Sequence, residues 1–487
     1  MFAGGIADRG LRFVLKWYLS GVVGPAGLGL YELSNVVART VSAFATVGVD
    51  TGALLFASRY RKTGELDRLK GTLLASSVII VVAGLLASVG LWLAATFGPW
   101  WADDPLARTA VQWTAPAVGA WCLVLLAQAL NRAAKDMKGI VVTKQVAMPL
   151  LMLAGCLVAV GVLGLDVLAA IVVLAGATAA SGIFGLVWAW RHYKGVLRDA
   201  AVRPRFEIRE LLKFSIPQSL TQAAFRLNVS MDVLMLGWLS DREQVGLYAI
   251  AAALASIGAI PANAVSSIFA PFIAELVYVK ELDRLDGLLK TVTRWLLIVA
   301  TPGYLLLFLL PDVVLGIYDD AYMASLTPLM VLVGAQLINT ICVPAMNTIP
   351  MAGYAMLNLV NGVVALGLNI GLNALLIPEY GSVGAAVATG ATLVLWSGWR
   401  LIEVRMLLRC FPFGPRSLGL LGVAVGGTAL VHFAGADWPL VARMGATGGA
   451  LLAFGGAALT FGRTADDDEL IAKVKRKLGR LLGRGGD

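Results

Sequence analysis

Residues 72–97 read TLLASSVIIVVAGLLASVGLWLAATF, which is a run of 26 residues without a charged side chain. A helix rises 1.5 Å per residue, so about 20 apolar residues cross the hydrocarbon core of a bilayer. The whole chain has the same character, since 59% of its 487 residues are apolar and only 14% are charged. A soluble domain is about half apolar and about a quarter charged. The composition therefore excludes a soluble enzyme with one large core and predicts a polytopic helical membrane protein.

Hydropathy over a window near the bilayer thickness predicts an all-α integral membrane fold with about 14 transmembrane helices. The first six spans are expected at residues 5–24, 28–58, 72–97, 108–130, 140–163 and 167–190. The next six are expected at 212–238, 245–277, 291–311, 325–349, 355–376 and 382–400, and a last pair at 417–434 and 441–461.

Lysine and arginine gather in alternate connections between these spans, as the positive-inside rule requires of cytoplasmic loops. The basic connections carry Arg59, Arg61, Lys62, Arg68 and Lys70; Arg132, Lys135 and Lys138; seven residues between Arg191 and Lys213; Lys280, Arg284, Lys290 and Arg294; and Arg400, Arg405, Arg409 and Arg416. The intervening connections are short and neutral or acidic. We therefore expect a multi-pass protein of the cytoplasmic membrane with both termini in the cytoplasm.

The chain repeats itself after about 216 residues. Gly29-Leu30-Tyr31 recurs as Gly246-Leu247-Tyr248, and the segment ELDRL at 65–69 recurs at 281–285. The interval equals six predicted spans, an even number, so the two copies cross the membrane in the same direction and form parallel repeats. The predicted organisation is two six-helix lobes plus two C-terminal helices.

Five segments follow from this repeat and from the charge pattern. They are an N-terminal lobe at 1–190, a basic cytoplasmic linker at 191–211, a C-terminal lobe at 212–410, an additional helix pair at 411–462, and a cytoplasmic, amphipathic, basic tail at 463–487. A solvated tail without fixed structure is the alternative for the last segment.

Catalytic and metal chemistry find no support in the sequence. The four cysteines have no paired spacing, and the two histidines, His192 and His432, lie far apart. We therefore predict no catalytic residue, no metal site and no cofactor. The net charge of +9 is spread over loops and the tail, which favours an anionic membrane surface over nucleic acid as its partner.

Polar stripes run along three of the predicted spans. Arg12 and Lys16 share one face of the first span, as do Glu32, Asn35, Arg39 and Asp50 in the second, and Gln222 and Arg226 in the seventh with Asp232 just beyond. Intramembrane charges are costly and indicate function by default. The alternatives are that Arg12 and Lys16 reach lipid headgroups, and that the arginines form buried pairs with Glu32 or Asp232 that only fix packing.

The balance of these intramembrane charges is cationic, which favours an anionic ligand because arginine matches phosphate oxygens bidentately. We predict that Arg12, Lys16, Arg39, Arg226, Gln222 and Asn35 bind the substrate. If a gradient of H⁺ or Na⁺ drives transport, the carboxylates available inside the spans are Asp232, Glu32 and Asp50. Four asparagines at roughly helical spacing, Asn358, Asn361, Asn369 and Asn373, form interhelical hydrogen bonds or contact sugar hydroxyls.

Several segments resemble the polysaccharide and O-antigen flippases, a family of the superfamily that also holds lipid II flippases and multidrug extruders. The resemblance rests on the GLY tripeptide of the second span with ASRYR at 57–61, FSIP at 214–217, MDVLMLG at 231–237 followed by VGLY at 245–248, and GSVGAA at 381–386. It covers about residues 1–410, and the second-half block is its more specific part.

The resemblance implies a transporter, not an enzyme, that flips a polyprenyl-diphosphate-linked oligosaccharide by alternating access around a cationic cavity. Arg12, Lys16, Arg39 and Arg226 are the positions that match the pyrophosphate-binding cations of such flippases. The expected partners are the lipid-linked glycan, membrane lipids and polysaccharide assembly proteins. The alternatives are a multidrug extruder coupled to H⁺ or Na⁺ and, disfavoured by the short outward connections, a membrane glycan polymerase or ligase.

Overall fold

The computed structural model describes residues 2–98, 104–434 and 438–461, and every regular element in these ranges is a helix. The predicted tail at 463–487 lies outside the described residues. By its internal contacts the chain divides into two compact units. Unit 1 comprises residues 1–250, 315–325 and 362–388, and unit 2 comprises 251–314, 326–361 and 389–487.

The helices of the first half are α1 (Phe2–Ala45), α2 (Val49–Thr63), α3 (Leu66–Phe97), α4 (Pro105–Ala133), α5 (Met137–Ile140), α6 (Met148–Cys156), α7 (Val167–Arg198) and α8 (Ile208–Leu239), with π-helical turns η2 (Val141–Ala147) and η3 (Leu157–Val162) beside α6. Those of the second half are α9 (Arg242–Ala255), η4 (Ser256–Gly258), α10 (Ala259–Tyr278), α11 (Leu282–Leu309), α12 (Pro311–Leu315), η5 (Asp320–Ser325), α13 (Leu326–Met351), α14 (Ala355–Leu408), α15 (Pro415–Ala434) and α16 (Leu440–Phe461).

Ten helical segments within the described ranges are long and apolar enough to cross a membrane. Two of them, in α1 and α14, contain a glycine with positive φ at which the helix breaks, Gly24 at 65° and Gly381 at 53°. Each of the fourteen predicted ranges overlaps helix, and the number of membrane crossings stays a prediction.

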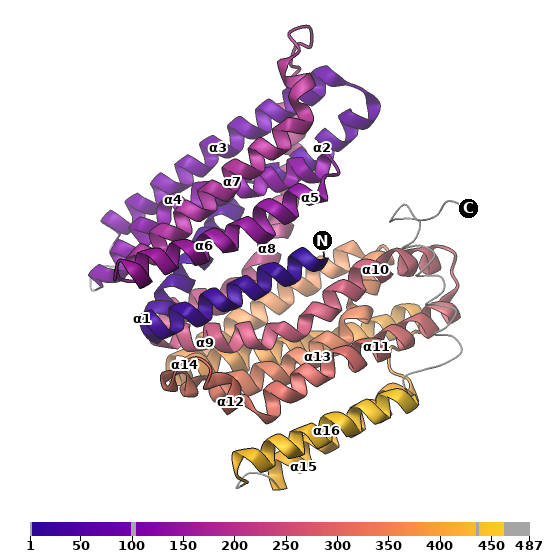
Figure 1. Ribbon diagram of the computed structural model, residues 1–487. Helices are drawn as coiled ribbons and strands as arrows, with labels where there is room; N and C mark the ends of the chain where they lie inside the picture. Colours follow the sequence, from indigo (N-terminus) through magenta and orange to yellow (C-terminus); the bar gives the residue numbers. More distant parts are fainter. Residues whose placement is uncertain (1, 99–103, 435–437, 462–487) are drawn as a thin grey trace. The chain divides into compact units, whose positions relative to one another are not determined.

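Within unit 1, α3, α4 and α7 lie side by side (Figure 1) and bury a shared core. Residues of α2 and Leu211 of α8 contribute to the same core. α1 packs against α4, α6, α7 and α8. In unit 2, α11 contacts α10, α13 and α15, and α15 runs beside α16 (Figure 1).

The two ELDRL segments have the same local structure. Glu65 occupies the N-cap position of α3 and pairs with Arg68, and Glu281 occupies the N-cap position of α11 and pairs with Arg284 at 2.7 Å. Neither side chain makes a capping hydrogen bond. The two GLY segments lie in α1 and α9 and contact each other, since a Cβ atom added at Gly29 would collide with the backbone of Arg242 and Gly246. The repeat seen in the sequence is therefore also a repeat of local structure.

Two basic side chains differ from their expected places. Arg294, assigned to a cytoplasmic connection, is 6% exposed inside α11. Arg400, which the charge pattern assigned to a cytoplasmic connection, is 2% exposed inside α14 and donates a hydrogen bond to Asn358 Oδ1 at 2.6 Å. Glu403, one turn later, accepts hydrogen bonds from Asn361 and Trp399. A buried polar network thus replaces a solvated loop, because α14 continues to Leu408.

The turn between α4 and α5 is held by Asp136. Its carboxylate accepts hydrogen bonds from Trp188 Nε1 and His192 Nε2 of α7, both at 2.7 Å, and from the backbone N–H groups of Lys138 and Gly139. Burial alone raises the pKa of Asp136, but the hydrogen bonds from Trp188, His192 and Gly139 outweigh burial and hold that pKa below its ordinary value.

This depressed pKa predicts a pH-dependent effect for Asp136→Ala. The Asp136 carboxylate stabilises the fold above its unfolded pKa of about 4, and this contribution is lost as the pH falls through the lower folded value. We expect Asp136→Ala to cost about 1–3 kcal/mol at pH 7 and much less at pH 3. Thermal unfolding at both pH values tests this. The control is Asp166→Ala, which removes an N-cap carboxylate that accepts a hydrogen bond from Leu168 N. An equal loss at both pH values would contradict the assignment.

Candidate functional site

The break at Gly24 folds α1 back on itself. In a straight helix, residues 16 and 32 lie about 24 Å apart along the axis, yet Lys16 Nζ lies 3.1 Å from Glu32 Oε1. Gly24 adopts a backbone conformation that favours glycine, and Pro25 follows it without an N–H to donate. This turn places the charges of the first predicted span beside the polar stripe of the second.

Four basic side chains of unit 1 are linked by electrostatic interactions that all include or surround Arg39. Arg39 of α1 interacts electrostatically with Arg12 and Arg226 and with the carboxylates of Glu32 and Asp8. Lys144 of η2 interacts with Arg39 and Arg12 and with the carboxylate of Asp8. We call Arg12, Arg39, Lys144 and Arg226 the cationic cluster. Since all four lie on helices with long apolar runs, their mutual repulsion is screened less than on a surface in water.

The cationic cluster is only partly neutralised. Arg12 pairs with Asp8 at 2.8 Å, and Lys144 donates a hydrogen bond to Gln128 Oε1 at 3.2 Å. The Arg39 guanidinium lies over the ring of Trp121, 5.6 Å from its centroid, and its side chain is exposed. Among the described residues no carboxylate forms an ion pair with Arg39 or Arg226. The cluster therefore keeps an excess of positive charge that an anionic group can neutralise.

A buried carboxylate, Asp232 of α8, lies in a ring of neutral donors. Tyr248 Oη donates to it at 2.7 Å, Asn373 Nδ2 at 3.0 Å and Asn369 Nδ2 at 3.1 Å. Asp232 is 7% exposed. All three donors are uncharged, so no cation pairs with this carboxylate among the described residues. We call this group the Asp232 site.

The remaining predicted residues are placed as follows. Asn35 is buried in α1, and its Oδ1 has no hydrogen-bond partner among the described residues. Lys16 and Glu32 pair with each other, and Lys16 also donates to the Ala249 carbonyl at 3.5 Å. Asp50 lies in the first turn of α2, within electrostatic range of Cys122. The side chain of Gln222 lies outside the described residues.

Sequence reasoning missed Trp121, Gln128 and Tyr248. Trp121 and Gln128 belong to the apolar helix α4, where a single aromatic or amide residue has no distinguishing pattern. Tyr248 belongs to the repeated GLY tripeptide, which indicated the repeat but not its partner Asp232. The asparagine stripe did contain a usable signal, because Asn369 and Asn373 are one helical turn apart and both reach Asp232.

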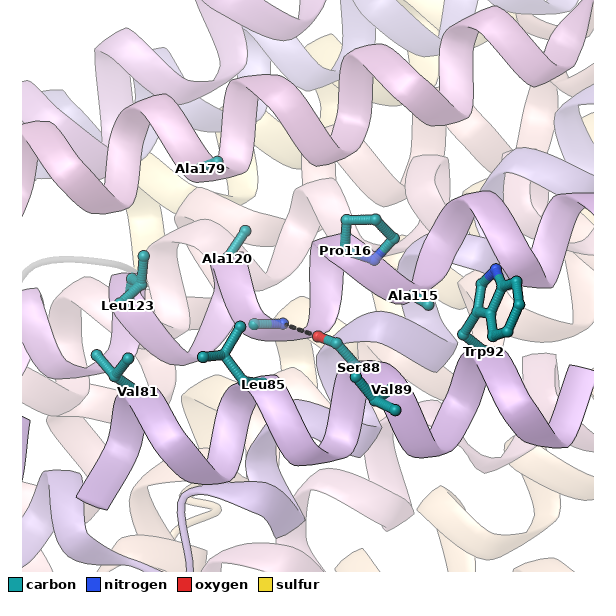
Figure 2. Close-up of a pocket in the computed structure, with 11 residues that line it drawn as sticks. Val81, Leu85, Ser88, Val89, Trp92, Ala115, Pro116, Ala120, Leu123 and Ala179 are labelled. Atoms are coloured by element: carbon teal, nitrogen blue, oxygen red, sulfur yellow. Dashed lines mark hydrogen bonds between the residues drawn. The ribbon is translucent and has the colours of Figure 1, made fainter. Parts of the chain in front are cut away.

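A separate groove between α3, α4 and α7 is almost wholly apolar. Its volume is about 440 Å³, and Figure 2 shows Val81, Leu85, Val89 and Trp92 of α3 facing residues of α4. Ser88 Oγ in this groove accepts a hydrogen bond from Gly119 N at 3.0 Å. Such a lining suits hydrocarbon and offers no charged group to a polar cargo.

No group of three or more His, Cys, Asp or Glu side chains that could hold a metal ion is found in the part of the chain that the structure describes. In unit 1 the cationic cluster offers electrostatic binding, and the Asp232 site offers hydrogen bonding.

Residues 1–277 match the family model described as "Polysaccharide biosynthesis protein". The chain belongs to this family. A curated relative, the probable flippase AglR of Haloferax volcanii, is 27% identical over 213 residues, which are 42% of this chain and 43% of the relative. The chain thus matches less than half of the length of that relative.

Two solved structures have the same fold at low sequence identity. The lipid II flippase MurJ in an inward closed conformation matches with a TM-score of 0.70 and 12% identity, over 95% of this chain and 99% of MurJ. An inward-facing multidrug resistance transporter of the MATE family matches with a TM-score of 0.66 and 14% identity, over 84% of this chain and 95% of the transporter.

These matches confirm the predicted family resemblance and the all-α membrane fold. They agree with a multi-pass membrane protein of the polysaccharide biosynthesis family. The relatives named above are described as flippases or transporters and not as enzymes.

Proposed function

We propose that this protein moves a polyprenyl-diphosphate-linked oligosaccharide from the cytoplasmic to the outer leaflet of the cytoplasmic membrane, with both termini in the cytoplasm. The observation that carries the proposal is the cationic cluster, in which Arg39 and Arg226 lack carboxylate partners among the described residues. Membership of the polysaccharide biosynthesis family supports a lipid-linked glycan as the cargo.

The cluster suits a diphosphate for two reasons. Guanidinium groups donate parallel hydrogen bonds to phosphate oxygens, and the diphosphate charge offsets the repulsion among the four cations. Arg12, Lys16, Arg39 and Arg226, with Asn35 and Gln222, are the proposed binding residues. In this mechanism the headgroup and glycan cross inside the protein by alternating access, while the polyprenyl tail stays in lipid.

The sign of the charge separates this function from extrusion of cationic drugs. A cationic drug would gain nothing from Arg39 and Arg226 and would be repelled by Lys144. The test is reconstitution of the protein in liposomes that contain a polyprenyl-diphosphate oligosaccharide, with the outward-facing glycan cleaved by an impermeant oxidant. We expect the protein to expose the glycan faster than empty liposomes do and to leave ethidium efflux unchanged. Ethidium efflux without glycan movement would favour the extruder.

The Asp232 site is the proposed point of ion coupling. The carboxylate can take up H⁺, and rotation of the Asn369 and Asn373 amides would offer oxygen ligands to Na⁺. Glu32 is a weaker candidate because Lys16 already neutralises it. No contact among the described residues joins Asp50 to Glu32 or to the Asp232 site.

Asp232→Asn is therefore expected to abolish the stimulation of glycan movement by an imposed H⁺ or Na⁺ gradient while it leaves gradient-free movement within about twofold of wild type. Initial rates with and without each gradient measure this. Asp50→Asn is the matched control. Stimulation that persists in Asp232→Asn would exclude Asp232 as the coupling group.

A further inference from the structure

A second polar pocket of unit 1 lies at the ends of the helices opposite the basic loops. α4 runs from Asp104 toward the basic turn at 132–138, and α8 runs from the basic linker toward Ser240. The pocket lies where these outer ends meet α1, has a volume of about 590 Å³, and is lined in part by Ser34, Asp104, Trp238, Ser240, Asp241 and Arg242. We call it the outer pocket.

An ion pair fixes one wall of the outer pocket. Arg242, at the start of α9, pairs with Asp104, which also caps α4 by accepting a hydrogen bond from Ala107 N at 3.0 Å. About a third of each side chain of the pair stays exposed, 31% for Arg242 and 36% for Asp104. Both groups therefore keep hydrogen-bonding capacity that a ligand can use.

The charge of the outer pocket differs in sign from that of the cationic cluster. Two carboxylates, Asp104 and Asp241, accompany one guanidinium, Arg242. Because the pair neutralises one carboxylate, the pocket has a net charge of about −1, which repels a diphosphate and leaves a neutral polar ligand unpenalised.

The remaining lining suits a ligand with both hydroxyl groups and apolar faces. Carboxylates accept hydrogen bonds from hydroxyls, and Arg242 and Ser240 donate to them. Trp238 is 79% exposed and presents a flat apolar ring with a polar N–H edge. The volume lies within the usual range for sites that bind small ligands, about 300–1,000 Å³.

We propose that the outer pocket binds uncharged sugar units of the cargo, with Trp238 as the stacking surface and Asp241 as the hydroxyl acceptor. The identity of the cargo rests on the proposed function. The two sites then divide the substrate by charge, with the diphosphate at the cationic cluster and sugar rings at the outer pocket.

Direct binding tests the pocket without transport. Purified protein is mixed with a panel of neutral hexoses and N-acetylhexosamines, and saturation transfer from protein to sugar is measured by NMR. We expect transfer for wild type and a loss of at least fivefold in Trp238→Ala and in Asp241→Asn. Trp92→Ala, in the apolar groove, is the control. The proposal is overturned if no sugar receives saturation, if both variants behave as wild type, or if tetraphenylphosphonium binds in place of the sugars.

A transport comparison separates this proposal from the proposed function. Liposomes receive polyprenyl diphosphate either without sugar or with an oligosaccharide. We expect Trp238→Ala and Asp241→Asn to slow the glycan-bearing lipid at least fivefold and the sugar-free lipid less than twofold. Equal slowing of both lipids contradicts a sugar site. A wild-type protein that moves neither lipid contradicts the proposed function, and the NMR measurement then decides the outer pocket alone.

Discussion

The double variant Arg39→Ala/Arg226→Ala is expected to move lipid-linked oligosaccharide at least a hundredfold more slowly than wild type in liposomes. Each hydrogen bond to a charged group is worth about 1.5–3 kcal/mol, and 1.4 kcal/mol corresponds to a factor of about ten. Neither arginine has a carboxylate partner among the described residues. Their loss therefore removes binding energy without leaving an unpaired acid.

Three further variants make this result specific. Arg39→Lys keeps the charge but loses the bidentate geometry, so an intermediate rate is expected. Arg416→Ala removes an exposed arginine at the start of α15 and should leave the rate unchanged. Arg39→Ala alone should fall between wild type and the double variant. A double variant within threefold of wild type would exclude the cationic cluster as the headgroup site.

Gly29→Leu is expected to hold the bend of α1 and the start of α9 apart. A side chain at Gly29 would collide with the Arg242 carbonyl, and one at Gly246 would collide with the Pro25 carbonyl, so the two backbones touch where the repeated GLY segments meet. Since backbone atoms cannot yield as a flexible side chain does, the variant must separate the helices. Glycan movement should fall at least tenfold, because this close approach of the two backbones can no longer form.

Labelling of a cysteine at Ser34 measures this separation. Ser34 is 3% exposed and lines the outer pocket, and the four native cysteines are buried. An impermeant maleimide should label Ser34→Cys slowly. It should label the double variant Ser34→Cys/Gly29→Leu at least tenfold faster. Gly21→Leu, at an α1 glycine with open space around it, is the matched control, and Gly29→Ala provides a milder variant. Unchanged labelling in both Gly29 variants would show that the contact does not close this end.

Much of the fold follows from patterns that the sequence displays directly. Runs such as 72–97 have one stable form in lipid, since a helix satisfies its own backbone hydrogen bonds. The GLY and ELDRL repeats indicated equivalent elements, and the structure places Glu65 and Glu281 at the same N-cap position of α3 and α11. The polar stripe of α1 likewise predicted that Glu32, Asn35 and Arg39 share one face.

Other features depend on contacts between distant segments. The pairing of Lys16 with Glu32 requires the turn at Gly24, and the placement of Trp121 under Arg39 requires α4 to pack against α1. Arg400 shows the same limit, because a charge count cannot tell a loop arginine from one that donates to Asn358 inside a continuing helix. Periodicity gives the face of a helix but not the partner of that face.

The most direct test of the cationic cluster is its affinity for a soluble diphosphate. Purified wild type and Arg39→Ala/Arg226→Ala are titrated with geranyl diphosphate and with geranyl monophosphate by calorimetry at about 0.15 M salt, where surface charges are screened beyond about 8 Å. We predict that wild type binds the diphosphate more tightly than the monophosphate, and that the double variant raises the Kd of the diphosphate at least tenfold. An equal Kd for both proteins would contradict the account.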